Sequence, residues 1–175
     1  MIRCYITDRR ALGGVAALLA NARRVAETVD WIQLREKDLQ PEELLAIARE
    51  LVKLPVKLIV NSNVEVAREI GAGLHLPAGV SVHASAPEFG VSCHSVAEVR
   101  RAAAAGAGYV LLSPIFPSPS KPGYGPALGL AQLAEAARTV EMPVLALGGV
   151  DESNAPACIA AGAAGYASIS AFQSS

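Results

Sequence analysis

The stretch Val29-Asp30-Trp31-Ile32-Gln33-Leu34-Arg35-Glu36-Lys37-Asp38 passes from apolar alternation into a cluster of charge. Successive side chains of a strand point to opposite faces, so Gln33, Arg35 and Lys37 are expected to share one face. Cations at the carboxyl end of a strand are what an α/β protein needs to hold a phosphate or pyrophosphate. A solvated turn between a strand and its helix is the alternative, because such turns are also rich in charge.

Eight short segments of β type recur along the chain, with segments of helical type between them. Strands are expected at residues 3–7, 30–35, 56–61, 73–77, 90–94, 109–116, 144–148 and 166–170. Helices are expected at residues 41–53, 96–105, 128–140 and 153–161, and Gly71, Gly106 and Gly162 follow helical stretches as left-handed caps. Such alternation builds a parallel sheet, and eight units predict an α/β fold, the (β/α)8 TIM barrel.

The chain of 175 residues is shorter than a usual barrel of about 200 residues or more. Glycine and proline break the segment 77–87, and the sequence stops within five residues of Ser170. We therefore expect residues 1–175 to form a single TIM-barrel domain, shortened at the fourth and last helical segments. An open doubly wound sheet is the alternative, but no Gly-x-Gly-x-x-Gly follows the first strand. A missing last helix would leave apolar strand faces uncovered, which predicts a homo-oligomer.

Composition restricts the function further. Hydrophobic residues make up 52% and charged residues 18%, which excludes a disordered chain, and a net charge of -1 predicts no nucleic-acid partner. Cys4, Cys93 and Cys158 are widely spaced, so they predict reduced core thiols rather than a disulfide framework or zinc site. The chain has no signal-type start and no run of roughly 18 apolar residues, which predicts a cytoplasmic protein with no membrane partner.

Active sites of such barrels lie at the carboxyl ends of the strands. Gly148 and Gly149, with residues 168–171 of the next strand end, match the place where many barrels bind phosphate; alternatively, the glycines only permit a tight turn. The proline-rich loop 113–125 could form a lid bearing Ser118, Ser120 and Lys121, or could be a structural loop without a role.

Several motifs together resemble the thiamine phosphate synthase family and its relative, the thiazole tautomerase TenI. They are QLREKD at 33–38, VSCHS at 91–95, PIFPSPSKPG at 114–123, GGV at 148–150 and ISA at 169–171. The resemblance implies a barrel that joins hydroxymethylpyrimidine pyrophosphate to thiazole phosphate and releases pyrophosphate. By position, the pyrimidine and pyrophosphate would be held by Gln33, Arg35, Lys37, Asn61, Ser92 and Lys121, with Arg35, Lys37 and Lys121 as the catalytic cations. The thiazole phosphate would be surrounded by Ser118, Ser120, Gly149, Ile169 and Ser170.

The chain departs from both branches of the family. The resemblance implies Mg2+, but the synthase has an acid where this chain has Ser62, and a second one shortly after His75-Leu76, where this chain reads PAGV at 77–80. No metal ligand is therefore predicted, and the cofactor stays open. His75 is a poor ligand for a hard ion and is expected to be a buried, satisfied imidazole. The tautomerase relies on a histidine whose matching position here is Pro114.

Three hypotheses follow from these departures. The first is a transferase of the synthase type with altered metal use. The second is a non-catalytic or regulatory protein that binds thiazole phosphate or thiamine phosphate, and the third is an isomerase that uses a residue other than Pro114. The missing acids favour the second and third hypotheses, whereas the cations Arg35, Lys37 and Lys121 favour pyrophosphate handling.

Overall fold

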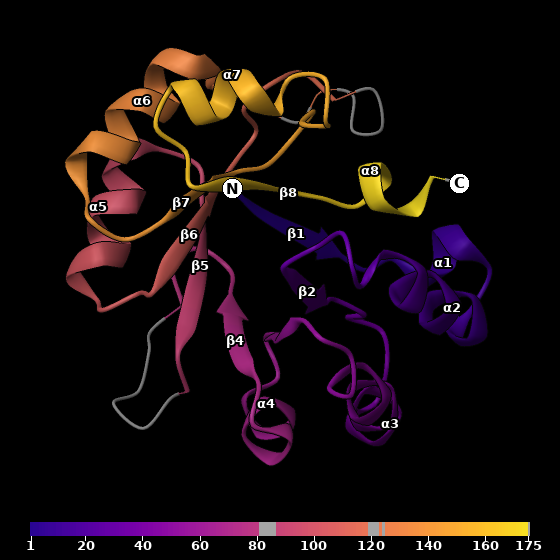
Figure 1. Ribbon diagram of the computed structural model, residues 1–175. Coiled ribbons are helices and arrows are strands. Elements are labelled where there is room, and N and C mark those ends of the chain that lie inside the picture. The colour runs from indigo at the N-terminus through magenta and orange to yellow at the C-terminus, as the bar shows by residue number, and fades with distance from the viewer. Residues whose placement is uncertain (81–86, 119–122, 124, 175) are drawn as a thin grey trace.

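The computed structural model is a closed barrel of eight parallel strands in chain order, in which each strand pairs with the next and β8 pairs with β1. The structure describes residues 1–80, 87–118, 123 and 125–174. The predicted TIM barrel is therefore confirmed (Figure 1). The strands are β1 (Ile2–Ile6), β2 (Trp31–Leu34), β3 (Lys57–Asn61), β4 (Gly73–Leu76), β5 (Phe89–Cys93), β6 (Tyr109–Leu112), β7 (Val144–Ala146) and β8 (Gly165–Ser168).

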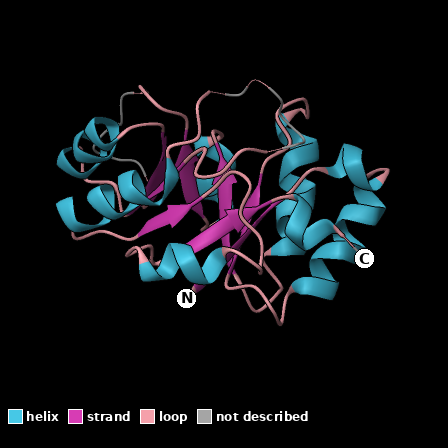
Figure 2. Ribbon diagram, turned by 90° about the horizontal axis from the view of Figure 1, so that it is seen from above, coloured by secondary structure: helices cyan, strands magenta, loops and turns pink. Residues whose placement is uncertain are grey.

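Helices surround the strands (Figure 2). In α2, Leu18, Ala22 and Val25 recur at helical spacing and are buried, as an amphipathic helix on a barrel requires. No helix of the described residues is long and apolar enough to cross a membrane. The helices are α1 (Arg9–Leu12), α2 (Val15–Val25), α3 (Pro41–Leu51), α4 (Val64–Ile70), α5 (Val96–Ala104), α6 (Gly129–Thr139), α7 (Ala155–Ala160) and α8 (Ser170–Gln173).

The barrel interior has its own core, separate from the larger core beneath the helices. It contains Cys4, Ile6, Ile59, Tyr109, Leu111, Leu145 and Ala167. These residues come from alternate strand positions, because every second side chain points inward. The strand register also places Asn61, His75, Gly90 and Tyr109 in one row across neighbouring strands, and three of these four carry polar side chains.

The last helical segment is short, as predicted, but it covers more than the sequence suggested. The Phe172 ring of α8 stacks on Tyr166 with centroids 5.7 Å apart and lies 6.2 Å from the Tyr5 ring. All three side chains are buried, and α8 lies between α7 and α1 in Figure 1. The expectation of an uncovered apolar face on strands one and eight is wrong, because one turn of helix supplies an aromatic cover. The homo-oligomer stays a prediction without that support.

Seven of the eight strands end earlier than predicted, by one to four residues, and in β6 and β8 the cause is visible. Strand β6 stops at Leu112 rather than residue 116, since Pro114 has no N–H to donate to a neighbouring strand. Strand β8 stops at Ser168, and Ser170, which we expected to close the strand, instead begins α8. The Ser168 hydroxyl accepts a hydrogen bond from the Ala171 N–H (3.1 Å), which turns the chain into that helix. After β4, residues 77–80, 87 and 88 form no helix, as predicted for the parts described.

Candidate functional site

Arg35 follows β2 at the carboxyl-end mouth of the barrel, where barrel enzymes place their active sites. Its backbone N–H donates to Thr7 Oγ1 (3.0 Å), whereas its guanidinium forms no ion pair with any carboxylate of the described residues. The neighbouring acids have other partners, because Arg9 pairs with Glu36 (3.2 Å) and with Asp38 (2.6 Å). The charge of Arg35 is therefore free for a ligand, which disfavours the solvated-turn interpretation.

Glu36 is a buried acid that the sequence analysis gave no role. Its Oε2 accepts a hydrogen bond from Thr7 Oγ1 (2.7 Å), and its Oε1 accepts from the Arg9 backbone N–H (3.0 Å) and from Arg9 Nη1 (3.2 Å). These bonds fasten the end of β2 to the end of β1. Strand alternation places Glu36 on the opposite face from Arg35, and this was the signal that could have identified it as structural.

Gln33 and Asn61 form an amide pair inside the mouth. Asn61 Nδ2 donates to Gln33 Oε1 (2.8 Å), and Ser62 Oγ donates to Asn61 Oδ1 (2.8 Å). The Gln33 Nε2 atom is buried and has no hydrogen-bond partner in the described part of the chain. An unpaired buried donor is unfavourable, so a ligand with an acceptor atom would stabilise this arrangement.

His75 connects the predicted Ser92 to the barrel interior. Its Nε2 lies 2.7 Å from Ser92 Oγ and its Nδ1 lies 3.0 Å from Tyr109 Oη. Burial, with a smaller contribution from the nearby Arg35 charge, lowers the pKa of His75 to about 4, so the imidazole is neutral at pH 7. The prediction of a buried, satisfied imidazole is confirmed. Tyr109 was missed, because no local pattern pairs it with His75.

The glycines after β7 are required by the packing of the chain itself. Gly148 has φ 94° and Gly149 has φ 66°, and residues that carry a side chain rarely adopt these backbone conformations. A Cβ on Gly148 would lie 2.8 Å from Pro114 Cα, and one on Gly149 would lie 2.7 Å from the Pro117 carbonyl oxygen. The tight-turn interpretation therefore explains why glycine stands here, and it leaves the backbone amides to be accounted for.

Those amides are available for an anion. Within the residues described, the N–H groups of Gly148, Gly149 and Val150 have no acceptor, and neither do those of Ile169 and Ser170. The two groups lie at the ends of adjacent strands, β7 and β8. Unpaired amides from neighbouring strand ends form a concavity suited to phosphate.

The remaining predicted site residues are Lys37, Ser118, Ser120 and Lys121. Lys37 is exposed beyond β2, and Ser118 is partly exposed in the loop after β6. Ser120 and Lys121 lie outside the described residues, as does the centre of the predicted lid. The described start of that loop is fastened to the end of β7, because the Ile115 N–H donates to the Leu147 carbonyl and the Phe116 N–H donates to the Gly148 carbonyl (both 3.0 Å).

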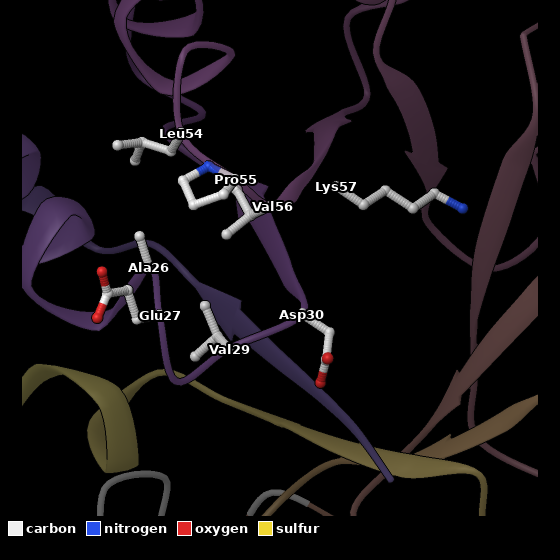
Figure 3. Close-up of a pocket in the computed structure, with 8 residues that line it drawn as sticks. All are labelled: Ala26, Glu27, Val29, Asp30, Leu54, Pro55, Val56 and Lys57. Atoms are coloured by element: carbon white, nitrogen blue, oxygen red, sulfur yellow. The ribbon is translucent and has the colours of Figure 1, made fainter.

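An open cleft of about 660 Å³ lies at the opposite, amino end of the barrel (Figure 3). Two of its three charged side chains, Asp30 and Lys57, already have partners. The Asp30 carboxylate accepts a hydrogen bond from the Arg3 backbone, and Lys57 pairs with Glu88 (2.9 Å) and lies 4.8 Å from the centre of the Trp31 ring. In Figure 3 the Lys57 side chain extends away from the other lining residues. This cleft gathers no converging groups for chemistry.

The donor atoms at the mouth do not fit a protein-held magnesium ion. The described residues contain no group of three or more His, Cys, Asp or Glu side chains that could hold a metal. Ser62, at the position of one expected acid, offers a hydroxyl that is already bonded to Asn61. Mg2+ prefers carboxylate and phosphate oxygens, and the described residues of the mouth gather no such set of ligands.

Comparison with known proteins agrees with this geometry. A thiamine-phosphate synthase from Roseiflexus sp. (strain RS-1) is 43% identical over 178 residues, covering 95% of this chain and 75% of that protein. One from Methanocella arvoryzae is 38% identical and covers 97% of this chain and 85% of its own. The solved thiamine phosphate pyrophosphorylase from Pyrococcus furiosus has a TM-score of 0.85 at 27% identity, covering 99% and 88% of the two chains. Residues 4–172 match the thiamine monophosphate synthase family, and the chain belongs to that family.

Proposed function

We propose that this protein joins hydroxymethylpyrimidine pyrophosphate to thiazole phosphate and releases pyrophosphate. The observation that carries the proposal is the guanidinium of Arg35, which has no ion-pair partner among the described residues, at the same end of the barrel as a set of unpaired backbone amides after β7 and β8. Relatives over nearly the whole chain are thiamine-phosphate synthases, which supports the same reaction. A cytoplasmic location belongs to the proposal as well.

The two substrates would divide the mouth between them. We assign the pyrimidine and its pyrophosphate to Gln33, Arg35, Lys37, Asn61, Ser92 and Lys121. We assign the thiazole phosphate to Ser118, Ser120, Gly149, Ile169 and Ser170. In the reaction, the bond from the pyrimidine methylene carbon to the pyrophosphate oxygen breaks, and a bond from the same carbon to the thiazole ring nitrogen forms. Negative charge grows on the leaving oxygens, and preorganised cations stabilise that charge more than they stabilise the ground state.

Product formation is the direct test. The protein is mixed with both substrates, with and without Mg2+, and thiamine phosphate is measured by mass spectrometry. We expect product with the unchanged protein and with Arg10→Ala, an exposed arginine that pairs with Asp38, and far less product with Arg35→Ala. Binding of thiazole phosphate without product would favour the regulatory alternative. Isomerisation of the thiazole without the pyrimidine would favour the tautomerase.

Magnesium affinity is a separate prediction of this site. We expect weak Mg2+ binding in the presence of pyrophosphate, and stronger binding in the double variant Ser62→Asp with Ala78→Asp, measured by titration calorimetry. Ser62 has φ 66°, a conformation that Asp and Asn tolerate better than most residues, so the substitution fits the backbone. Ser62→Asn with Ala78→Asn is the neutral control. A tight stoichiometric site in the unchanged protein would contradict the prediction.

A further inference from the structure

Three side chains form one hydrogen-bonded line from the sealed barrel interior to the mouth. Tyr109 and His75 are buried, whereas Ser92 is partly exposed. Tyr109 Oη lies 3.0 Å from His75 Nδ1, and His75 Nε2 lies 2.7 Å from Ser92 Oγ. Only the last member of the line can meet a ligand directly.

The position of the tyrosine is determined by its neighbours. A Cβ added to Gly90 would lie 2.0 Å from Tyr109 Cζ, so the ring occupies the space that any other residue at 90 would need. Gly90 has no left-handed φ, and its role is therefore space rather than backbone freedom. On another side, the Trp31 ring meets Tyr109 edge to face at 4.9 Å. These contacts hold the phenol against His75.

The hydrogen bonds select one tautomer of the imidazole. A neutral imidazole has one N–H donor and one acceptor nitrogen. If Nδ1 carried the proton, it would donate to Tyr109, and the buried phenol hydrogen would have no acceptor among the described residues. If Nε2 carries it, Tyr109 donates to Nδ1 and Nε2 donates to Ser92 Oγ, which satisfies both buried groups. Burial keeps the ring neutral, with the pKa of His75 lowered to about 4.

This tautomer determines what Ser92 offers to a ligand. In this tautomer the Ser92 oxygen accepts the His75 proton, so its own hydrogen is left for another acceptor, and Ser92 is partly exposed. We propose that Tyr109 and His75 are positioning residues that hold the Ser92 hydroxyl as a hydrogen-bond donor to an acceptor atom of the pyrimidine substrate. The inference rests on the proposed function for its ligand, and the acceptor is either a pyrophosphate oxygen or a pyrimidine ring nitrogen.

The tautomer is tested first, on the unchanged protein. Nitrogen NMR of the imidazole, assigned with a His75→Gln variant, reports which ring nitrogen carries the proton. We expect the proton on Nε2. A proton on Nδ1 would overturn the proposal whatever the protein catalyses, so this result is independent of the synthase reaction.

The second test is a double-mutant cycle on binding, with inorganic pyrophosphate and hydroxymethylpyrimidine as separate probes. We expect Ser92→Ala and Tyr109→Phe each to weaken the same probe by roughly 2- to 10-fold, the range for one hydrogen bond. We expect Tyr109→Phe to have no further effect in the Ser92→Ala background, because it acts through Ser92. The probe that responds identifies the acceptor.

Tyr166→Phe is the matched control, because that tyrosine is also buried but lies on β8, outside the line of Tyr109, His75 and Ser92. It should change neither probe. Equal losses from Tyr109→Phe in both backgrounds, or no response of either probe to Ser92→Ala, would overturn the proposal. Failure to make thiamine phosphate with the cycle intact would instead reject only the proposed function.

Discussion

The two halves of the barrel mouth differ in the groups that they offer to a ligand: one offers side chains and the other offers backbone amides. The side-chain half, at the ends of β2 to β5, consists of Gln33, Arg35, Asn61 and Ser92, held by hydrogen bonds from other strands. The backbone half, at the ends of β7 and β8, consists of amides from residues 148–150, 169 and 170, shaped by glycine packing. Both suit anions, but one half binds with side-chain charge and the other with backbone dipoles.

This difference determines how each half responds to mutation. In the side-chain half, the residue that would bind the ligand and the residue that holds it are different, so affinity and stability can be changed separately. Arg35 is the example, because Glu36 and Arg9 fasten the strand end while Arg35 stays unpaired among the described residues. In the backbone half the same glycines shape the site and maintain the packing, so a substitution should affect both together.

The largest expected effect is a loss of stability on substitution of Glu36, the acid whose hydrogen bonds join the end of β2 to the end of β1. Glu36→Ala removes the acceptor of Thr7 and of Arg9 and leaves a partly buried guanidinium without that partner. Breaking a buried pair in this way typically costs about 3–5 kcal/mol, and urea unfolding of the variant would measure this loss. Glu50→Ala is the control, since that acid pairs with Lys53 on the surface and should cost about 0–1 kcal/mol. Equal losses in the two variants would show that Glu36 fastens nothing.

The backbone half is tested by Gly149→Ala. The residue would adopt a left-handed conformation, costing roughly 1–2 kcal/mol, and its Cβ would clash with the Pro117 carbonyl, costing roughly 1–3 kcal/mol. We expect a loss of roughly 2–5 kcal/mol together with weaker phosphate binding. Gly71→Ala is matched, because Gly71 has φ 70° with open space around it and should show only the smaller backbone term. Normal phosphate affinity in Gly149→Ala would remove Gly149 from the site.

The same contrast explains what the sequence could predict. Strand alternation and eight repeated units were enough for the barrel and for Gln33 and Arg35 at the mouth, because these depend on local periodicity. The cover supplied by Phe172 and the partnership of His75 with Tyr109 were not predictable, because they join residues far apart in the chain. Glu36 was visible only as a charge, and its partners on β1 become neighbours when the barrel closes.

An intermediate effect is expected from pH, through His75. Its folded pKa of about 4 lies below the ordinary 6.5, so the unfolded state binds the proton more readily. The stability that comes from keeping His75 neutral is therefore fully present above pH 6.5 and is lost as the pH falls from 6.5 to about 4. Below pH 4, His75 causes no further change in stability. A pKa difference of this size corresponds to about 3 kcal/mol of unfolding free energy. Urea unfolding of His75→Gln should lack this part of the pH dependence, and identical profiles of the two proteins would contradict it.

The smallest effect is the one that separates ligand binding from stability. Arg35→Ala should weaken pyrophosphate binding by roughly 1.5–3 kcal/mol, the range for a hydrogen bond to a charged group, and leave the melting temperature nearly unchanged. Arg35→Lys should recover only part of the affinity, because a point charge cannot reproduce a bidentate fork. Arg9→Ala is the matched opposite, since it breaks the pairs with Glu36 and Asp38 and should lower stability first. If Arg35→Ala lowered the melting temperature and left binding unchanged, Arg35 would belong with Arg9 as a structural cation. The side-chain half would then lose the charge on which the proposed pyrophosphate chemistry depends.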